Sequence, residues 1–255
     1  IYTLSLHDAL PILVIGGPLM ATGAVRGISE TREKNTKVEK RHLILCEGRD
    51  ELGFLIAYLN SAHLSATPGF SEDIQVMDFG GNSDLLEQLK VLKVTPGFDE
   101  VKTLLIVRDA ERDANAAIRQ IRTALEKNAF TAPDSPRQWV TDKRNKDIEI
   151  GFLLFPVCHG TPVAGTLEDL CAFILKEPNP PKLLETVDRF LDQLKTERGR
   201  DFTHRFKTRL HTCLAVSDKY VGMKIGEAAK AGAFDWSDER LTPLREFIQE
   251  KMCRG

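Results

Sequence analysis

Residues 101–111 read VKTLLIVRDAE, and this stretch decides the fold of the chain. Leu104–Val107 form an unbroken apolar run bounded by charged residues, which is typical of a strand buried on both faces of a parallel sheet. Similar runs occur at 41–48 (RHLILCEG), 73–81 (DIQVMDFGG) and 147–157 (DIEIGFLLFPV). Helical patterns follow these runs, at 50–62, 82–93, 113–130 and 165–176. The chain therefore alternates strands with helices.

This alternation predicts right-handed βαβ units and a parallel sheet. We expect an α/β domain over residues 41–176, with a Rossmann-like parallel sheet of about four strands flanked by helices. The Pro-bearing stretch at 128–146 is interpreted as a loop. After EPNPP at 177–181 all the patterns are helical, so residues 177–255 are expected to form a helical C-terminal extension packed on the core.

The chain begins IYTLSLHDALPI, and these twelve residues back-translate to a common sequencing adapter. We therefore interpret residues 1–12 as a translated adapter artefact and exclude them from fold reasoning. Residues 13–40 are Gly-rich and then charged, as in a flexible lead-in. The apolar run near the start has no basic residues before it and is too short to span a membrane, so we expect neither a signal peptide nor a membrane anchor.

Composition bounds the function further. The hydrophobic fraction of 42% and the charged fraction of 28% indicate a soluble globular protein. With a formal net charge of −2, any binding of nucleic acid must depend on a local basic patch. The five cysteines are widely spaced and form no CxxC pair, which favours reduced thiols in a cytoplasmic protein over disulfides or a zinc site.

Carboxylates follow three of the four predicted strands. Parallel sheets bind ligands at the carboxyl ends of their strands, so these side chains are expected to share one edge. Crowded carboxylates are unfavourable alone, and a hard divalent cation removes the conflict. We predict a site for one or two Mg²⁺ or Mn²⁺ ions whose candidate ligands are Glu47, Glu51, Asp109, Glu111, Glu168 and Asp169.

Each acidic motif also has a simpler interpretation. Acidic residues at the start of a helix favour the helix dipole, and Thr166 with its following carboxylates is a plausible cap. Asp113 is expected to be a helix N-cap rather than a ligand. Gly80 and Gly81 are candidates for close approach of the backbone to a phosphate, but a tight turn explains them as well.

The C-terminal region supplies basic residues. Residues 182–230 contain eleven Lys and Arg against seven Asp and Glu, a local net charge of +4. His204, Lys207 and His211 are spaced for one helix face and are candidates for binding a phosphate backbone, although a solvated basic face gives the same pattern. Trp139 and Trp236 are candidates for base stacking, with packing in the protein as the favoured alternative.

The motif order, LILCEG with a second Glu followed by LLIVRDAE, resembles a Toprim domain, the metal-dependent module of topoisomerases, primases and several nucleases. Glu47 matches the family's Glu, and Asp109 with Glu111 matches its DxD motif as DxE. The EGxxE spacing and GTLEDL are similar to overcoming-lysogenization-defect (OLD) nucleases. Residues 41–255 as a whole, with GTLEDLC, KTRLHTCLA and IGEAAKAGAFDW, resemble uncharacterised stand-alone Toprim-related proteins.

The resemblance implies a metal-dependent nuclease that hydrolyses phosphodiesters of DNA or RNA, acting in phage defence with an ABC-type ATPase partner. It implies that Glu47 is a metal ligand or the general acid/base, that Asp109 is a metal ligand, and that Lys207 stabilises charge in the transition state. The longer Glu111 departs from DxD, and octahedral Mg²⁺ is demanding in geometry. A catalytically degenerate regulatory or scaffold subunit of an ATPase complex is therefore the alternative, and primase-like nucleotidyl transfer is a third.

Overall fold

The computed structural model describes residues 37–65, 73–80, 85–156, 160–176 and 180–252 of the chain. The predicted adapter segment, most of the predicted lead-in and Gly81 lie outside these residues. The end of the lead-in differs from expectation, because it belongs to the fold. The Val38 side chain is buried, and its backbone N–H donates to the Pro96 carbonyl at 2.9 Å.

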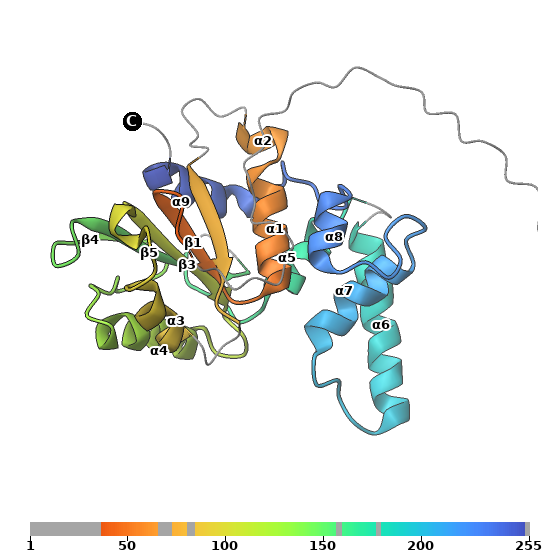
Figure 1. The fold of residues 1–255 in the computed structure, drawn as a ribbon. Coiled ribbons are helices and arrows are strands. Elements are labelled where there is room, and N and C mark those ends of the chain that lie inside the picture. Colours follow the sequence, from red (N-terminus) through yellow and green to blue (C-terminus); the bar gives the residue numbers. More distant parts are fainter. Residues whose placement is uncertain (1–36, 66–72, 81–84, 157–159, 177–179, 253–255) are drawn as a thin grey trace, which may run out of the picture.

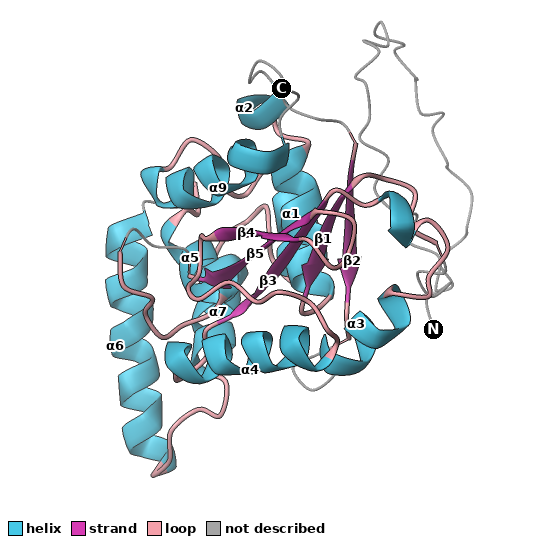
Figure 2. Cartoon of the chain, turned by 90° about the vertical axis from the view of Figure 1, so that its left-hand side faces the viewer, coloured by secondary structure: helices cyan, strands magenta, loops and turns pink. Residues whose placement is uncertain are grey.

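A five-stranded sheet forms the centre of the molecule (Figure 2). Its order is β2 (Ile74–Asp78), β1 (His42–Cys46), β3 (Thr103–Asp109), β5 (Ile148–Phe155) and β4 (Trp139–Asp142). The first four strands are parallel and β4 pairs antiparallel with β5 at the edge. The structure confirms the α/β class and the mostly parallel sheet, with one strand more than expected.

The additional strand β4 lies inside the stretch that we interpreted as a loop. Its side chains are mostly half-exposed, so it lacks the apolar run that marks the other strands. Two tertiary contacts fix it instead. The Trp139 ring stacks on Phe247 with centroids 4.5 Å apart, and the buried Asp142 carboxylate accepts hydrogen bonds from Thr131, Arg144 and Asn145.

Helices cover both faces of the sheet (Figures 1 and 2). Because side chains alternate along a strand, Leu104 and Ile106 of β3 face one layer while Leu105 and Val107 face the other. The first layer holds α3 (Leu85–Leu92), α4 (Ala114–Lys127) and the short η1 (Phe98–Glu100). The second layer begins with α1 (Arg49–Leu59), α2 (Ala62–Ser65) and α5 (Leu167–Phe173).

The C-terminal helices complete the second layer rather than forming a separate unit. They are α6 (Pro180–Arg198), α7 (Arg205–Ala215), α8 (Ile225–Lys230), η2 (Glu239–Leu241) and α9 (Thr242–Met252). Their apolar side chains belong to the same buried cluster as those of α1 and α5. The described C-terminal helices therefore pack on the α/β core. In the described segments, no helix is both long and apolar enough to cross a bilayer.

Helix α8 contacts α1 through two glycines. A Cβ atom at position 53 would lie 2.6 Å from the Gly226 Cα, and one at position 226 would lie 3.0 Å from the Gly53 Cα. The two backbones therefore touch, and no larger residue fits between them. This contact fixes the C-terminal helices against the helix that follows β1.

We expect Gly53→Ala to destabilise the protein by about 1–3 kcal/mol, because the new methyl group forces the two helices apart. Gly226→Ala should cost less, since its Cβ has slightly more room. Chemical denaturation measures both. Asn115→Ala, at an exposed position of α4, is the control and should change stability by less than about 0.5 kcal/mol. A Gly53→Ala protein as stable as the parent would contradict this account of the contact.

Candidate active site

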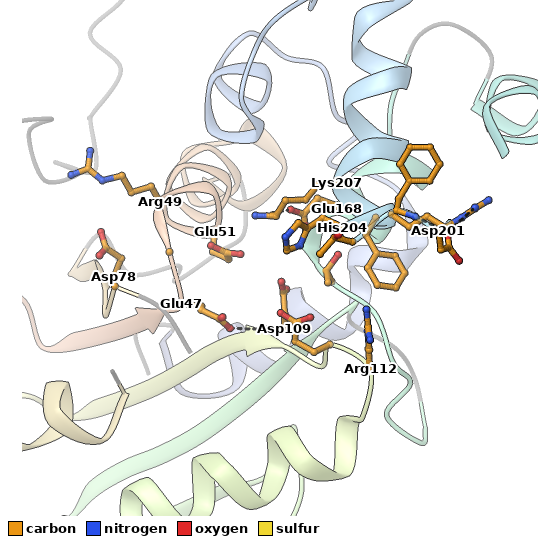
Figure 3. A pocket seen from close by; sticks show the side chains of 18 residues that line it. Glu47, Arg49, Glu51, Asp78, Asp109, Arg112, Glu168, Asp201, His204 and Lys207 are labelled. Carbon is orange, nitrogen blue, oxygen red and sulfur yellow. Dashed lines mark hydrogen bonds and ion pairs between the residues drawn. The ribbon is translucent and has the colours of Figure 1, made fainter. Parts of the chain in front are cut away.

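A cavity of about 1030 Å³ opens at the carboxyl ends of β1 and β3 (Figure 3). The turns after these strands and the start of α5 form its acidic side, and residues 201–207 before and within α7 form the opposite side. The side chains that carry charge or a hydroxyl into it are Glu47, Arg49, Glu51, Asp78, Asp109, Glu111, Arg112, Thr166, Glu168, Asp201, Thr203, His204, Arg205 and Lys207. Both the α/β part of the chain and the C-terminal helices therefore contribute residues to the cavity.

Glu47 and Asp109 are brought together by strand pairing. Cys46 of β1 is in register with Val107 of β3, so the residues that follow both strands meet at one edge. The Asp109 backbone N–H faces Glu47 Oε2 at 3.5 Å, and Asp109 Oδ1 accepts a hydrogen bond of 2.9 Å from the Leu167 backbone N–H. The first turn of α5 therefore holds the buried Asp109 carboxylate in place.

Glu51 and Glu168 enter the cavity from the first turns of α1 and α5. Both are buried, with 8% and 3% of their surface exposed. Glu168 Oε1 lies 3.5 Å from Lys207 Nζ, whereas Glu168 Oε2 is buried and has no hydrogen-bond partner. A buried carboxylate oxygen without a partner carries a large desolvation cost, which a hydrogen-bond donor or a cation at this position would offset.

Burial and mutual repulsion change the proton affinity of these carboxyls. Burial, assisted by the charges of Glu51, Glu168 and Glu47, raises the pKa of Asp109 well above its usual range. Burial, then repulsion by Glu168 and Glu47, raises the pKa of Glu51 to about 7. Burial also raises the pKa of Glu47, and Arg108 partly opposes that rise. The fully ionised state of this carboxylate cluster is therefore energetically unfavourable without a bound cation or proton.

Glu111 is held in an unusual backbone conformation. Its φ of 55° lies in the left-handed region, and its backbone exchanges two hydrogen bonds with Gly165, of 2.8 and 2.7 Å. Non-glycine residues persist in this region only where the surroundings fix them, often at functional sites. The Glu111 side chain lines the cavity.

Cationic side chains line the other side of the cavity. Lys207 lies on α7, and His204 stands at the N-cap of that helix. Partial burial opposes the charge of Lys207, but Glu168 and other carboxylates outweigh it and raise the lysine pKa. The ammonium group therefore stays positive beside the acidic cluster.

Several predicted residues lie elsewhere. Asp169 completes the Thr166 capping box, where its carboxylate accepts from the Thr166 backbone N–H at 3.0 Å, and it faces Arg209 at 4.0 Å rather than lining the cavity. His211 is exposed and also lies off the cavity.

Two other expectations concern Gly80 and Asp113. Gly80 lines the cavity. Asp113 caps α4 as expected, with its carboxylate accepting from the Ala116 N–H at 3.1 Å.

Both tryptophans pack inside the protein, as the favoured interpretation predicted. Trp139 stacks on Phe247 and donates to the Phe247 carbonyl at 3.3 Å. Trp236 packs against the rings of Phe54, Tyr58 and Phe234. Each ring is half-buried and in contact with other aromatic rings. The described cysteines Cys46, Cys171 and Cys213 are buried and free of disulfides.

Three groups of cavity residues have no counterpart in the candidate residues from the sequence. Arg49 and Arg112 lie inside the acidic motifs EGRDE and DAERDA, whose interpretation rested on the carboxylates alone. In the segment 201–206, which leads into α7, only His204 was a candidate. Thr166 was assigned only as a cap. The presence of an arginine within each acidic motif, Arg49 and Arg112, was the only sequence feature that could have indicated these residues.

The donor set fits Mg²⁺ or Mn²⁺. The candidate ligands in the cavity are hard carboxylate oxygens, and one of them, Glu168 Oε2, has no partner. Among the described residues, no three His, Cys, Asp or Glu side chains stand in a preformed metal-binding arrangement. The fit is therefore one of donor chemistry alone, and Glu47, Glu51, Asp109, Glu111 and Glu168 are the residues that could hold such an ion.

Comparison with known families places the chain. Residues 41–253 match the family described as "Protein of unknown function (DUF3226)". The chain belongs to this family. A hypothetical protein from Pyrococcus horikoshii OT3, PH0156, is similar in structure, with 16% sequence identity, a TM-score of 0.48, and coverage of 84% of this chain and 95% of that one. No curated protein matches the chain.

The raised pKa of Glu51 predicts how stability depends on pH. Between its ordinary pKa of 4.5 and its folded pKa of about 7, the folded protein binds more protons than the unfolded chain. The free energy of unfolding of the metal-free protein therefore falls as pH rises through this window. Glu51→Gln removes the penalty, so it should stabilise the protein at pH 8 by up to about 3 kcal/mol and much less at pH 5.

Denaturant unfolding in the presence of a chelator measures this effect at both pH values. Glu250→Gln, at an exposed position of α9, is the matched control and should leave the pH dependence unchanged. An equal effect of Glu51→Gln at pH 5 and pH 8 would contradict the assigned proton uptake.

Proposed function

We propose that this protein is a metal-dependent nuclease that hydrolyses nucleic-acid phosphodiesters with Mg²⁺ or Mn²⁺. The observation that carries the proposal is the convergence of carboxylates from three chain segments on one cavity, the half-buried Glu47 with the buried Asp109 and Glu168, and with Lys207 opposite. The order of these residues along the chain resembles Toprim domains, and the lysine from the C-terminal part resembles OLD nucleases.

The cation would be held by Asp109 and Glu168, with Glu51 and Glu111 beside them. When bound, it would supply positive charge to the phosphate oxygens and lower the pKa of a coordinated water. Glu47 is suited to accept a proton from the attacking water, because burial raises the pKa of its carboxyl toward the working range of a base. Lys207 is placed to stabilise negative charge on the transferred phosphoryl group.

Binding of the substrate would use the cationic side of the cavity. Lys207, His204 and Arg205 line the side formed by the residues before and within α7, and Arg49 and Arg112 add positive charge from the turns after β1 and β3. These groups would contact the phosphate backbone, so binding should weaken as salt rises. In keeping with the Toprim and OLD resemblance, we propose a role in phage defence with an ABC-type ATPase as partner.

Cleavage of labelled DNA and RNA in Mn²⁺ or Mg²⁺ tests the proposal. Glu47→Gln and Asp109→Asn should each lower kcat/KM by more than about 100-fold. The asparagine at 109 keeps an acceptor for the Leu167 N–H, so the fold should survive. Asp169→Asn is the matched control and should keep most of the activity, because Asp169 caps a helix outside the cavity.

Equal losses in Asp169→Asn and Asp109→Asn would contradict the assigned site. Absence of cleavage on every nucleic acid, with the ATPase partner present as well as absent, would instead favour the regulatory or scaffold subunit.

Lys207→Met should lower kcat by about 100-fold, as expected when one stabilising donor is lost from a transition state. Lys207→Arg should restore part of the rate, because it keeps the charge. Steady-state kinetics measures the effect, with the exposed Lys182→Met as control. A rise in KM with an unchanged kcat would show that Lys207 belongs only to a solvated basic face.

A further inference from the structure

A second cavity, of about 400 Å³, lies on the opposite face of the sheet from the acidic cavity. It is bounded by α3 and α4, which cover that face, and by the end of β3. The described residues that line it are Leu85, Leu86, Arg108, Ala116, Arg119, Gln120, Thr123, Ala124 and Lys127. This set contains three cationic side chains and no acidic one.

Arg108 is the unusual member of this set. It directly precedes Asp109 on β3, so the alternation of the strand sends its side chain to the α3–α4 face while Asp109 faces α5. Only 1% of its surface is exposed. Its Nε lies 3.7 Å from Glu47 Oε2, too far for a hydrogen bond, and both Nε and Nη1 lack a hydrogen-bond partner.

A buried guanidinium in this state is costly. The group stays charged in proteins and offers five N–H donors in a planar fork. Burying a charge without complete pairing is strongly unfavourable, and one carboxylate at 3.7 Å leaves the fork largely unused. A second anion in the cavity would satisfy the open donors.

Helix α4 provides further donors around the same cavity. Arg119, Thr123 and Lys127 are spaced four residues apart along the helix, so they lie on one face. Arg119 faces Asp113 at 3.6 Å, and both side chains of this pair are exposed. Such a pair is weak in water, so the arginine remains available to a ligand.

We propose that this second cavity is a binding site for a phosphate group. The Arg108 guanidinium in the cavity wall would supply positive charge to the phosphate, Arg119 and Lys127 would supply the remaining charge, and Thr123 and Gln120 would supply neutral donors. This number of donors exceeds what a single carboxylate uses. The cavity volume also leaves room for more than the phosphate itself, as for a nucleotide or the phosphorylated end of a strand.

The proposal does not rest on the nuclease function, because it concerns binding alone. Calorimetry in the presence of a chelator measures binding without a metal ion in the acidic cavity, and the α4 variants below assign the binding to the second cavity. The probes are inorganic phosphate, adenosine 5′-monophosphate, adenosine, and a short oligonucleotide with a 5′-phosphate or a 5′-hydroxyl. The first two should bind and adenosine should not, and the oligonucleotide pair distinguishes a free nucleotide from a strand end.

The double variant Arg119→Ala/Lys127→Ala should weaken binding of phosphate and of the monophosphate by about tenfold or more, since each lost charged contact is worth roughly that factor. Arg122→Ala is the matched control on the same helix, because Arg122 pairs with Asp134 outside the cavity. Arg108→Lys should weaken binding further by removing the fork. If Arg108→Lys fails to fold, the comparison of the double variant with Arg122→Ala still tests the proposal.

Two results would overturn the proposal. One is that neither inorganic phosphate nor the monophosphate binds the parent protein. The other is that Arg122→Ala weakens binding as much as the double variant, which would show nonspecific attraction to a basic surface. Nuclease activity has no bearing on either result, so this site and the proposed function fail independently.

Discussion

The parallel pairing of β1 with β3 is the constraint on which the site depends. It places the residues that follow Cys46 and those that end β3 at one edge of the sheet, so Glu47 and Asp109 must share a small volume. Asp109 is buried together with Glu51 and Glu168, and Glu47 is half-buried beside them. A cluster of carboxylates of this kind is unfavourable without a cation. The fold therefore maintains a local instability that a divalent ion would relieve.

The C-terminal helices make the site complete. Lys207 reaches Glu168 from α7, and α7 belongs to the same buried cluster as α1, α5 and α8. The contact of Gly53 with Gly226 fixes α8 against α1, which itself carries Glu51. Loosening the contact between Gly53 and Gly226 should therefore disturb the cavity as well as the core. The C-terminal residues of the cavity are positioned by helix packing and not by the ends of strands.

The sequence predicts the parts of the site that follow from local rules. Glu47 and Asp109 are predictable because apolar runs reveal strands, and strands of a parallel sheet end at one edge. Asp169 was not separable from Glu168, because neighbours on a helix point about 100° apart and only the packing of α5 decides which one faces the cavity. Strand β4 and the residues of 201–206 other than His204 depend on tertiary contacts, so no local pattern predicts them.

Arg108 and Asp109 are adjacent on β3, and their side chains point to opposite faces of the sheet. Asp109 faces the acidic cavity and Arg108 faces the basic one, so adjacent residues serve opposite faces of the sheet. Glu47 is within 3.7 Å of the Arg108 guanidinium and is also part of the acidic cluster. An anion that draws the guanidinium away would leave Glu47 with less positive charge nearby. A ligand in the second cavity would thereby raise the affinity of Glu47 for a proton or a metal ion, and by reciprocity a metal ion would favour that ligand.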